Sequence, residues 1–302
     1  MFRLAYNTNG LAHHRILDAL DLLADLGYEG VSITPDVGEL DLYRLDRALV
    51  AEVRARAADR GLALTVETGA RFLLDPRRKH HPTLLDDDPA GRLKRVDMLR
   101  RSIDLAVDLG ADLVSLWSGA APASSDGASI HGDDARDAHG DARRGGGDLE
   151  SLWTRLCDGL ALVLDHAQEN GVRVAFEPEP GMFIERPNGY AELVARLGPR
   201  GRRLGLCLDV GHLLVTRDLP VEHVVQRHAS QLAHVHLDDI RGGVHEHLMF
   251  GRGELDLRAV LRSLIDIGYR GLAAVELSRE SHRGAQAAAE ALSHVRRALD
   301  TN

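Results

Sequence analysis

The sequence predicts a (β/α)8 barrel, in which eight parallel strands alternate with eight helices in a single domain that spans residues 1–302. Two observations support this fold class. Short apolar runs alternate with longer amphipathic runs eight times along the chain, as eight strand–helix units require. Several amphipathic runs end at a glycine that suits a left-handed helix cap, and the next apolar run follows within a few residues: Gly27, Gly61, Gly110, Gly171 and Gly268.

Each element is assigned from its own stretch of sequence. The short apolar runs place strands at 3–7, 30–34, 62–67, 112–117, 172–177, 204–209, 232–237 and 272–276. The amphipathic runs place helices at 15–26, 45–60, 91–109, 149–170, 190–197, 221–229, 257–267 and 285–299. A doubly wound open sheet is the alternative, but it would need a glycine-rich phosphate loop after the first strand. That position reads YNTNGLAHH, which has one glycine and therefore favours the barrel.

The bulk composition restricts the class of partner. The net charge is −9, the pI is about 6.0, and basic residues form no clustered stripe, which argues against binding to nucleic acid or to an anionic membrane. Aromatic residues make up only 4% of the chain, so aliphatic side chains must fill the core. The two cysteines define neither a disulfide framework nor a cysteine zinc site. The chain start lacks a signal-peptide pattern and no apolar run has the length of a membrane helix, so we expect a soluble cytoplasmic protein.

Residues 120–148 differ in composition from the rest of the chain. This stretch is rich in Gly, Ala, Asp and Ser and has almost no large apolar residue. Such a segment cannot bury enough apolar surface to offset the entropy of ordering it. We therefore expect a mobile loop insertion after the fourth strand, with His131 and His139 solvated rather than bound to metal.

Four polar residues close four successive strands in the second half of the chain. The runs VRVAFE, RLGLCLD, LAHVH and LAAVE end at Glu177, Asp209, His236 and Glu276. Because each strand is followed by a helix, the four side chains are expected at one mouth of the barrel. Three carboxylates and one imidazole suit a single divalent cation. We expect Mn²⁺, with Mg²⁺, Co²⁺ or Zn²⁺ as alternatives.

Other residues near these strand ends are candidate substrate contacts. His212 lies three residues after Asp209, and the intervening Gly211 permits a tight turn that directs both side chains to the mouth. The alternative for this pair is a helix-capping Asp beside an exposed His. Glu185, on the loop after the fifth strand, and His247, before the G-R-G turn, are further candidates.

The loops of the first half add a second set of candidates. Lys79 and His80 belong to an Arg-Arg-Lys-His-His run after the third strand, which would either hold a phosphate or carboxylate or remain a solvated loop. Trp117 ends the fourth strand and would either stack on the apolar face of a sugar or pack against the barrel rim. Arg241, after the seventh strand, is also predicted to bind substrate.

Glu177 and Glu276 close the fifth and last strands, so they are expected to face each other across the mouth. Two opposed carboxylates at a metal suit the removal and return of a proton on a carbon next to a carbonyl. The metal would polarise the oxygens of the substrate and stabilise an enediolate. This arrangement predicts a catalytic pair.

These motifs resemble those of the xylose-isomerase-like TIM-barrel superfamily of sugar (phosphate) isomerases and epimerases, which also includes the AP endonuclease family 2 barrels. The resemblance is carried by FEPEP, LDVGH, HVHLDD, the His before GRG, and VEL. It implies a divalent-metal-dependent isomerase or epimerase of a small sugar-like molecule. By similarity, Glu177, Asp209, His236 and Glu276 would hold the metal, the two Glu would be the acid–base pair, and His212 would bind substrate.

The sequence departs from two branches of this superfamily. Glu67 and Trp117 occupy strand ends where the DNA-repair branch needs histidines for extra zinc ions, so the nuclease reading is disfavoured. Phe183 lies six residues after Glu177, where the epimerase branch often carries a second Glu. A lyase remains an alternative, resembling an inosose or dehydroshikimate dehydratase or a C-glycoside-cleaving enzyme. A barrel that binds a metabolite without turnover is a further alternative, and a homo-oligomer is compatible with the sequence.

Overall fold

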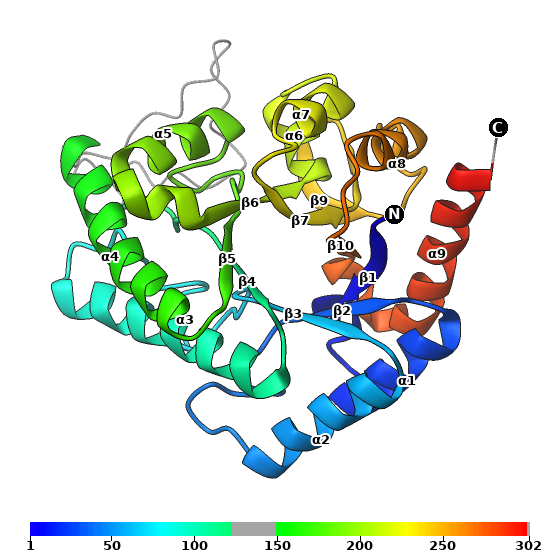
Figure 1. Cartoon of the computed structure of the whole chain (residues 1–302), viewed down its shortest axis with the longest axis horizontal. Coiled ribbons are helices and arrows are strands. Elements are labelled where there is room, and N and C mark those ends of the chain that lie inside the picture. The colour runs from blue at the N-terminus through cyan, green and yellow to red at the C-terminus, as the bar shows by residue number, and fades with distance from the viewer. Residues whose placement is uncertain (123–148, 301–302) are drawn as a thin grey trace.

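The computed structural model describes residues 1–122 and 149–300, and within them eight parallel strands close into a barrel (Figure 1). Around the barrel the strands follow the order β1-β10-β7-β6-β5-β4-β3-β2. Their bounds are β1 Arg3–Asn7, β2 Gly30–Ile33, β3 Ala63–Glu67, β4 Leu113–Leu116, β5 Arg173–Phe176, β6 Leu204–Asp209, β7 Leu232–Leu237 and β10 Leu272–Val275. The predicted (β/α)8 barrel is confirmed, and each predicted strand agrees to within one residue at either end.

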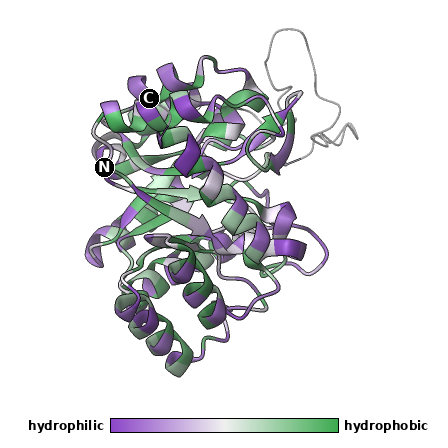
Figure 2. Ribbon diagram, turned by 90° about the vertical axis from the view of Figure 1, so that its right-hand side faces the viewer, coloured by the Kyte–Doolittle hydropathy of each residue, from purple (hydrophilic) through white to green (hydrophobic). Residues whose placement is uncertain are grey.

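Helices surround the barrel and cover the outer faces of its strands (Figure 1). Figure 2 shows hydrophobic residues concentrated in the strands and on the helix sides that face them, with hydrophilic residues toward the outside. No helix in the described ranges has the length and apolar character needed to cross a membrane. The helices are α1 Ile16–Leu26, α2 Arg47–Asp59, α3 Pro89–Leu109, α4 Leu149–Glu169, α5 Pro187–Leu197, α6 Val210–Thr216, α7 Val221–Arg227, α8 Leu257–Asp266 and α9 Gly284–Asp300, with 3-10 turns η1 Thr8–Leu11, η2 Gly198–Arg203 and η3 Ser278–Arg283.

Two elements at the barrel mouth are additions to the predicted pattern. Helix α6 begins directly after β6, because the Asp209 side chain caps it by accepting a hydrogen bond from the backbone N–H of His212 at 3.0 Å. A short antiparallel hairpin, β8 (Asp239–Arg241) and β9 (Val244–Leu248), follows β7. The predicted mobile insertion at 120–148, with His131 and His139, lies outside the described residues except for positions 120–122.

The strand period of two residues places alternate side chains inside the barrel. Small residues such as Ala175 and Ala274 fill its lower layers and are fully buried. A polar layer lies above them, where Ser32 Oγ is 2.7 Å from Thr65 Oγ1 and 3.1 Å from His234 Nε2. The next inward positions along the strands are the residues of the mouth, so the register that packs the interior also builds the site.

Candidate metal centre and active site

Four side chains meet at the carboxyl ends of the barrel strands. One ligand atom from each of Glu177, Asp209, His236 and Glu276 lies within 4.8 Å of the other three, and all four residues are buried. His236 Nδ1 is 2.9 Å from Glu177 Oε1 and 3.1 Å from Glu276 Oε2. The structure thus brings together the four residues that the sequence predicted as metal ligands.

The chemistry of this group suits a divalent cation. Carboxylate oxygens and an imidazole nitrogen are donors that Mn²⁺, Mg²⁺, Co²⁺ and Zn²⁺ accept to different degrees. Among the described residues, Asp209 Oδ2 is buried without a hydrogen-bond partner. A buried carboxylate oxygen without a partner costs free energy unless a donor or a cation satisfies it. The donor set and the unpaired oxygen therefore both fit a single ion at this position.

Buried charges shift the pKa values of the group. Burial alone would raise the pKa of Glu276, but positive His236 and His247 hold it well below its usual range. Burial alone would lower the pKa of His236, yet Cys207, Glu177 and Glu276 raise it well above its usual range. In each of these two residues the opposite charge beside it therefore favours the charged form. A cation at the mouth would offset the same negative charge.

Glu67 adds a further carboxyl group beside the four. Its Oε2 atom is 3.9 Å from His236 Nε2 and accepts a hydrogen bond from the side-chain amide of Asn7. Burial and then the negative charge of Glu276 raise the pKa of Glu67 well above its usual value. The side-chain amide of Asn9 donates a hydrogen bond of 2.9 Å to Glu276 Oε1, the carboxylate oxygen that does not contact His236 Nδ1.

A cluster of three histidines, His212, His245 and His247, borders the metal ligands. Ligand atoms of the three lie within 4.8 Å of one another. His212 Nε2 is 2.9 Å from His245 Nε2, and His212 Nδ1 is 3.2 Å from the carbonyl oxygen of Pro178. His247 Nδ1 is 2.6 Å from Asp238 Oδ2 at the base of the β8–β9 hairpin.

Protonation states within this cluster follow from its charges. Burial would lower the pKa of His212, but Asp209 and Glu179 raise it to about 9. Burial and then positive His212 lower the pKa of His245 to about 2. At neutral pH His212 therefore donates one N–H to Pro178 and the other to neutral His245.

Gly211 lies in the first turn of α6, where the sequence had predicted a tight turn instead of a helix. A Cβ atom at this position would overlap the carboxylate of Asp238. Asp238 is fully buried, and neither of its carboxylate oxygens makes a hydrogen bond with the described residues, although its Oδ2 is close to His247. The residue after Asp209 and Val210 must therefore be a glycine if β7 and α6 are to approach this closely.

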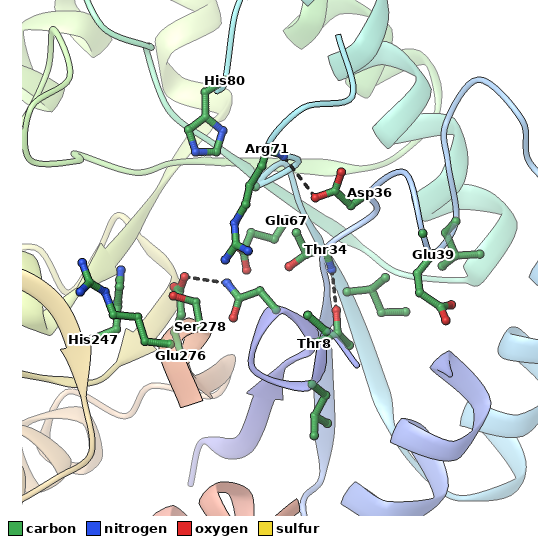
Figure 3. Close-up of a pocket in the computed structure, with 18 of the residues that line it drawn as sticks. Thr8, Thr34, Asp36, Glu39, Glu67, Arg71, His80, His247, Glu276 and Ser278 are labelled. Carbon is green, nitrogen blue, oxygen red and sulfur yellow. Dashed lines mark hydrogen bonds between the residues drawn. The ribbon is translucent and has the colours of Figure 1, made fainter. Parts of the chain in front are cut away.

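A cavity of about 420 Å³ opens beside the metal ligands, and the carboxylates of Glu67, Glu177 and Glu276 form its floor. Figure 3 shows Glu276, Glu67, Arg71, His80 and His247 around it, with Thr8, Thr34, Asp36 and Glu39 on the side of β1 and β2. The side chains that line it come from loops after several strands of the barrel. The charged, aromatic and hydroxyl side chains among them include Glu67, Arg71, Lys79, His80, Trp117, Glu177, Glu179, His245, His247, Glu276, Ser278 and Arg279.

The predicted substrate contacts divide into two groups. Lys79, His80, Trp117 and His247 line the cavity, and His212 reaches it through His245. Glu185 and Arg241 are not among the cavity-lining residues. Glu185 accepts a hydrogen bond from the backbone of Gly181, and Arg241 donates to the backbone of Arg252. Both side chains thus close turns within their own loops.

Sequence reasoning did not select Arg279 and Ser278, which line the cavity from η3. They follow Glu276 within three residues. The only sequence signal is their place in the loop after the last strand, where a (β/α)8 barrel carries site residues. Glu179, on the FEPEP loop, also lines the cavity, and burial raises its pKa to about 7.

The family described as "Xylose isomerase-like TIM barrel" matches residues 20–298. The chain belongs to this xylose isomerase-like barrel family. The resemblance found in the sequence motifs is therefore confirmed at the level of the family.

Two curated relatives show the range of proteins to which the chain is similar. The chain is 28% identical over 148 residues to an inosose dehydratase of Geobacillus thermodenitrificans, a match that covers 43% of this chain and 49% of that enzyme. It is 26% identical over 271 residues to the L-ribulose-5-phosphate 3-epimerase UlaE of Shigella flexneri, covering 88% and 83% of the two chains. The matches to the first curated relatives span about half or less of their length.

Solved structures of the same barrel agree in fold. A crystal structure of the IolI protein with a bound zinc atom superposes with a TM-score of 0.72 and 17% identity, over 99% of this chain and 98% of the other. At this identity the likeness concerns the fold.

Proposed function

We propose that the protein is a divalent-metal-dependent isomerase or epimerase of a sugar or sugar phosphate. The observation that carries the proposal is the pair of buried carboxylates, Glu177 and Glu276, both within 3.1 Å of one nitrogen of His236. In the barrel their strands, β5 and β10, are separated by β6 and β7, so the two carboxylates approach from different directions. The cavity that they border falls in the size range of small-molecule sites.

The metal is proposed at Glu177, Asp209, His236 and Glu276. The donor set, the unpaired Asp209 oxygen and the zinc atom of the similarly folded IolI structure support it. Mn²⁺ is our first choice, and Mg²⁺, Co²⁺ and Zn²⁺ are alternatives. When bound, the ion would polarise the carbonyl and hydroxyl oxygens of a sugar.

The two glutamates would then move the proton. One carboxylate takes the proton from a carbon next to the carbonyl, and the C–H electron pair becomes the double bond of an enediolate. The other glutamate returns a proton. Return to the same carbon from the opposite face inverts it and gives an epimer, whereas return to the neighbouring carbon gives an isomer. His212, His247, Trp117, His80 and Lys79 are proposed to hold the substrate.

A lyase is the second candidate, because the relatives include an inosose dehydratase. The first step would be the same. The enolate would then expel a hydroxyl group from the next carbon, and with the proton of a neighbouring acid this group leaves as water. The end product therefore separates the two candidates.

The test is incubation of a ketose with the protein in D₂O, with and without Mn²⁺. The proposal expects deuterium at the carbon next to the carbonyl in the recovered ketose or its epimer, and only when the metal is present. An unsaturated product with loss of water would favour the lyase. Exchange that is unaffected by complete removal of divalent metals would overturn the proposal.

A further inference from the structure

Three cationic side chains line the rim of the cavity, away from the carboxylates at its floor. Arg71 and Lys79 come from the loop between β3 and α3, and Arg279 comes from η3 after β10. Figure 3 shows the Arg71 side chain directed into the cavity, away from Asp36, whose carboxylate accepts the backbone N–H groups of Arg71 and Val37. The cavity is thus acidic at the floor and basic at part of its rim.

The loop that carries Arg71 and Lys79 is held in place by specific contacts. The backbone N–H of His80 donates to the carbonyl oxygen of Arg71 at 2.7 Å, which brings the two cationic positions together. From α3, the buried side chain of Arg95 donates to the carbonyl oxygens of Pro82, at 2.8 Å, and His80. These hydrogen bonds hold the loop as one wall of the cavity and therefore fix the backbone positions of Arg71 and Lys79.

His80 forms part of the same wall. Its ring packs edge-on against Trp117, with ring centroids 5.4 Å apart. His80 Nδ1 lies 3.0 Å from the carbonyl oxygen of Ala70 and donates its proton there. Burial and the nearby Lys79 ammonium lower the pKa of His80 to about 4. The imidazole is therefore neutral at pH 7 and leaves the positive charge of this wall to Arg71 and Lys79.

The like charges of Arg71, Lys79 and Arg279 repel one another, and water screens them because all three side chains are exposed. Partial burial and the positive charges of Arg71 and Arg279 lower the pKa of Lys79, while Glu179 acts in the opposite direction. Within the described residues, Arg71 and Lys79 make no side-chain ion pair. Arg279 has only long contacts, at 3.4 Å, to Glu246 and to the backbone of His245.

We propose that Arg71, Lys79 and Arg279 bind an anionic group, a phosphate or a carboxylate, on the part of the substrate remote from the reacting carbon. Guanidinium and ammonium groups are the usual partners of such anions. The inference rests on the proposed function, because it names the substrate class of the same site. The neutral, hydroxylated end of the substrate would lie at the acidic floor of the cavity, and its charged end would lie at the basic rim.

The test is titration calorimetry of the full chain in low-salt buffer with inorganic phosphate and with acetate. The variants are Arg71→Gln/Lys79→Gln and, from the other wall, Arg279→Gln. Arg77→Gln is the matched control, because Arg77 lies in the same loop, is exposed and does not line the cavity. Circular dichroism checks that each variant is folded. A second series compares L-ribulose 5-phosphate with L-ribulose.

We expect the double variant to weaken anion binding by about tenfold or more, as loss of charge-assisted hydrogen bonds does, and Arg279→Gln to weaken it less. Arg77→Gln should bind like the wild type. Tighter binding of phosphate than of acetate would indicate a phosphate ester, and equal binding would indicate a sugar acid. Wild-type affinity in the double variant or an equal loss in Arg77→Gln would overturn the inference. Where phosphate binds more tightly than acetate, the lack of a preference for L-ribulose 5-phosphate over L-ribulose would overturn it as well.

This result is independent of turnover. Deuterium exchange into a neutral ketose without any anion binding would overturn the anionic subsite and leave the proposed function standing. Anion binding at the rim without metal-dependent exchange would overturn the proposed function and leave the anionic subsite standing.

Discussion

Gly211 shows how closely single residues limit this site. The carboxylate of Asp238 occupies the space that a Cβ atom at position 211 would need, and Asp209 lies two residues earlier. A side chain here would push β7 and α6 apart. Because these elements also carry His236 and His212, the displacement would reach the metal ligands and the histidine cluster directly.

We therefore expect Gly211→Ala to lower the free energy of unfolding by about 1–3 kcal/mol, as overpacking does, and to reduce metal content. Urea denaturation and elemental analysis measure the two effects. Gly38→Ala is the control, because a Cβ atom there meets nothing within 4 Å. Equal stability and metal content in the two variants would show that the close approach at Gly211 is unimportant.

At the residue scale, the sequence predicted that the four candidate ligands lie together, as they do, but not the positions of all their neighbours. Glu177, Asp209, His236 and Glu276 were predictable because each follows an apolar strand whose period of two fixes its direction. Asp238 continues the two-residue period of His234 and His236, whereas Arg279 lies in a segment without such a period. The position of Arg279 depends on η3, which forms through contacts between distant parts of the chain.

At the scale of elements, the loop between β3 and α3 couples folding to pH through His80. Burial lowers the pKa of His80 to about 4, whereas an unfolded His has a pKa of about 6.5. As pH falls below 6.5, the unfolded chain takes up the proton first. The stability contributed by neutral His80 is therefore complete above about pH 6.5 and is lost as pH falls toward 4.

We expect the free energy of unfolding of the wild type to fall more steeply between pH 7 and pH 5 than that of His80→Gln, by about 2 kcal/mol. Urea denaturation at the two pH values provides the comparison, and the other histidines are common to both proteins. Parallel losses of stability would mean that His80 is not held neutral by the loop.

The bounds of most elements could be predicted because strand and helix periodicities are local properties of the sequence. Helix α6 could not, since it is short and its start depends on the cap that Asp209 provides. The β8–β9 hairpin was also missed, although the alternation in VHEHL is compatible with a strand. The pairing partner Asp239–Arg241 has too few residues to show a pattern.

At the scale of the whole molecule, the metal is expected to stabilise the single barrel domain. A ligand that binds only the folded state at 100 times its Kd adds about 2.7 kcal/mol. We expect Mn²⁺ to raise the melting temperature of the wild type by several degrees, in one cooperative transition. Differential scanning calorimetry after chelation and after re-addition of metal measures this.

The control for that experiment is Asp209→Asn. Asn is as good an N-cap as Asp, so α6 should persist while the ligand charge is lost. The variant should melt cooperatively and respond little to Mn²⁺. A full response would place the ion elsewhere, and two separate transitions in the wild type would contradict the single domain.

We infer that Glu276 exchanges a proton with carbon as well as contributing to the metal site. The most direct measurement is deuterium incorporation from D₂O into a ketose by Glu276→Gln, with excess Mn²⁺ and with metal occupancy verified by elemental analysis. Glu169→Gln, at the exposed end of α4, is the matched control. We predict that Glu276→Gln, with metal and ketose bound, loses about 10² to 10⁴ in exchange rate while the control keeps the wild-type rate. Wild-type exchange in metal-loaded Glu276→Gln would contradict the account.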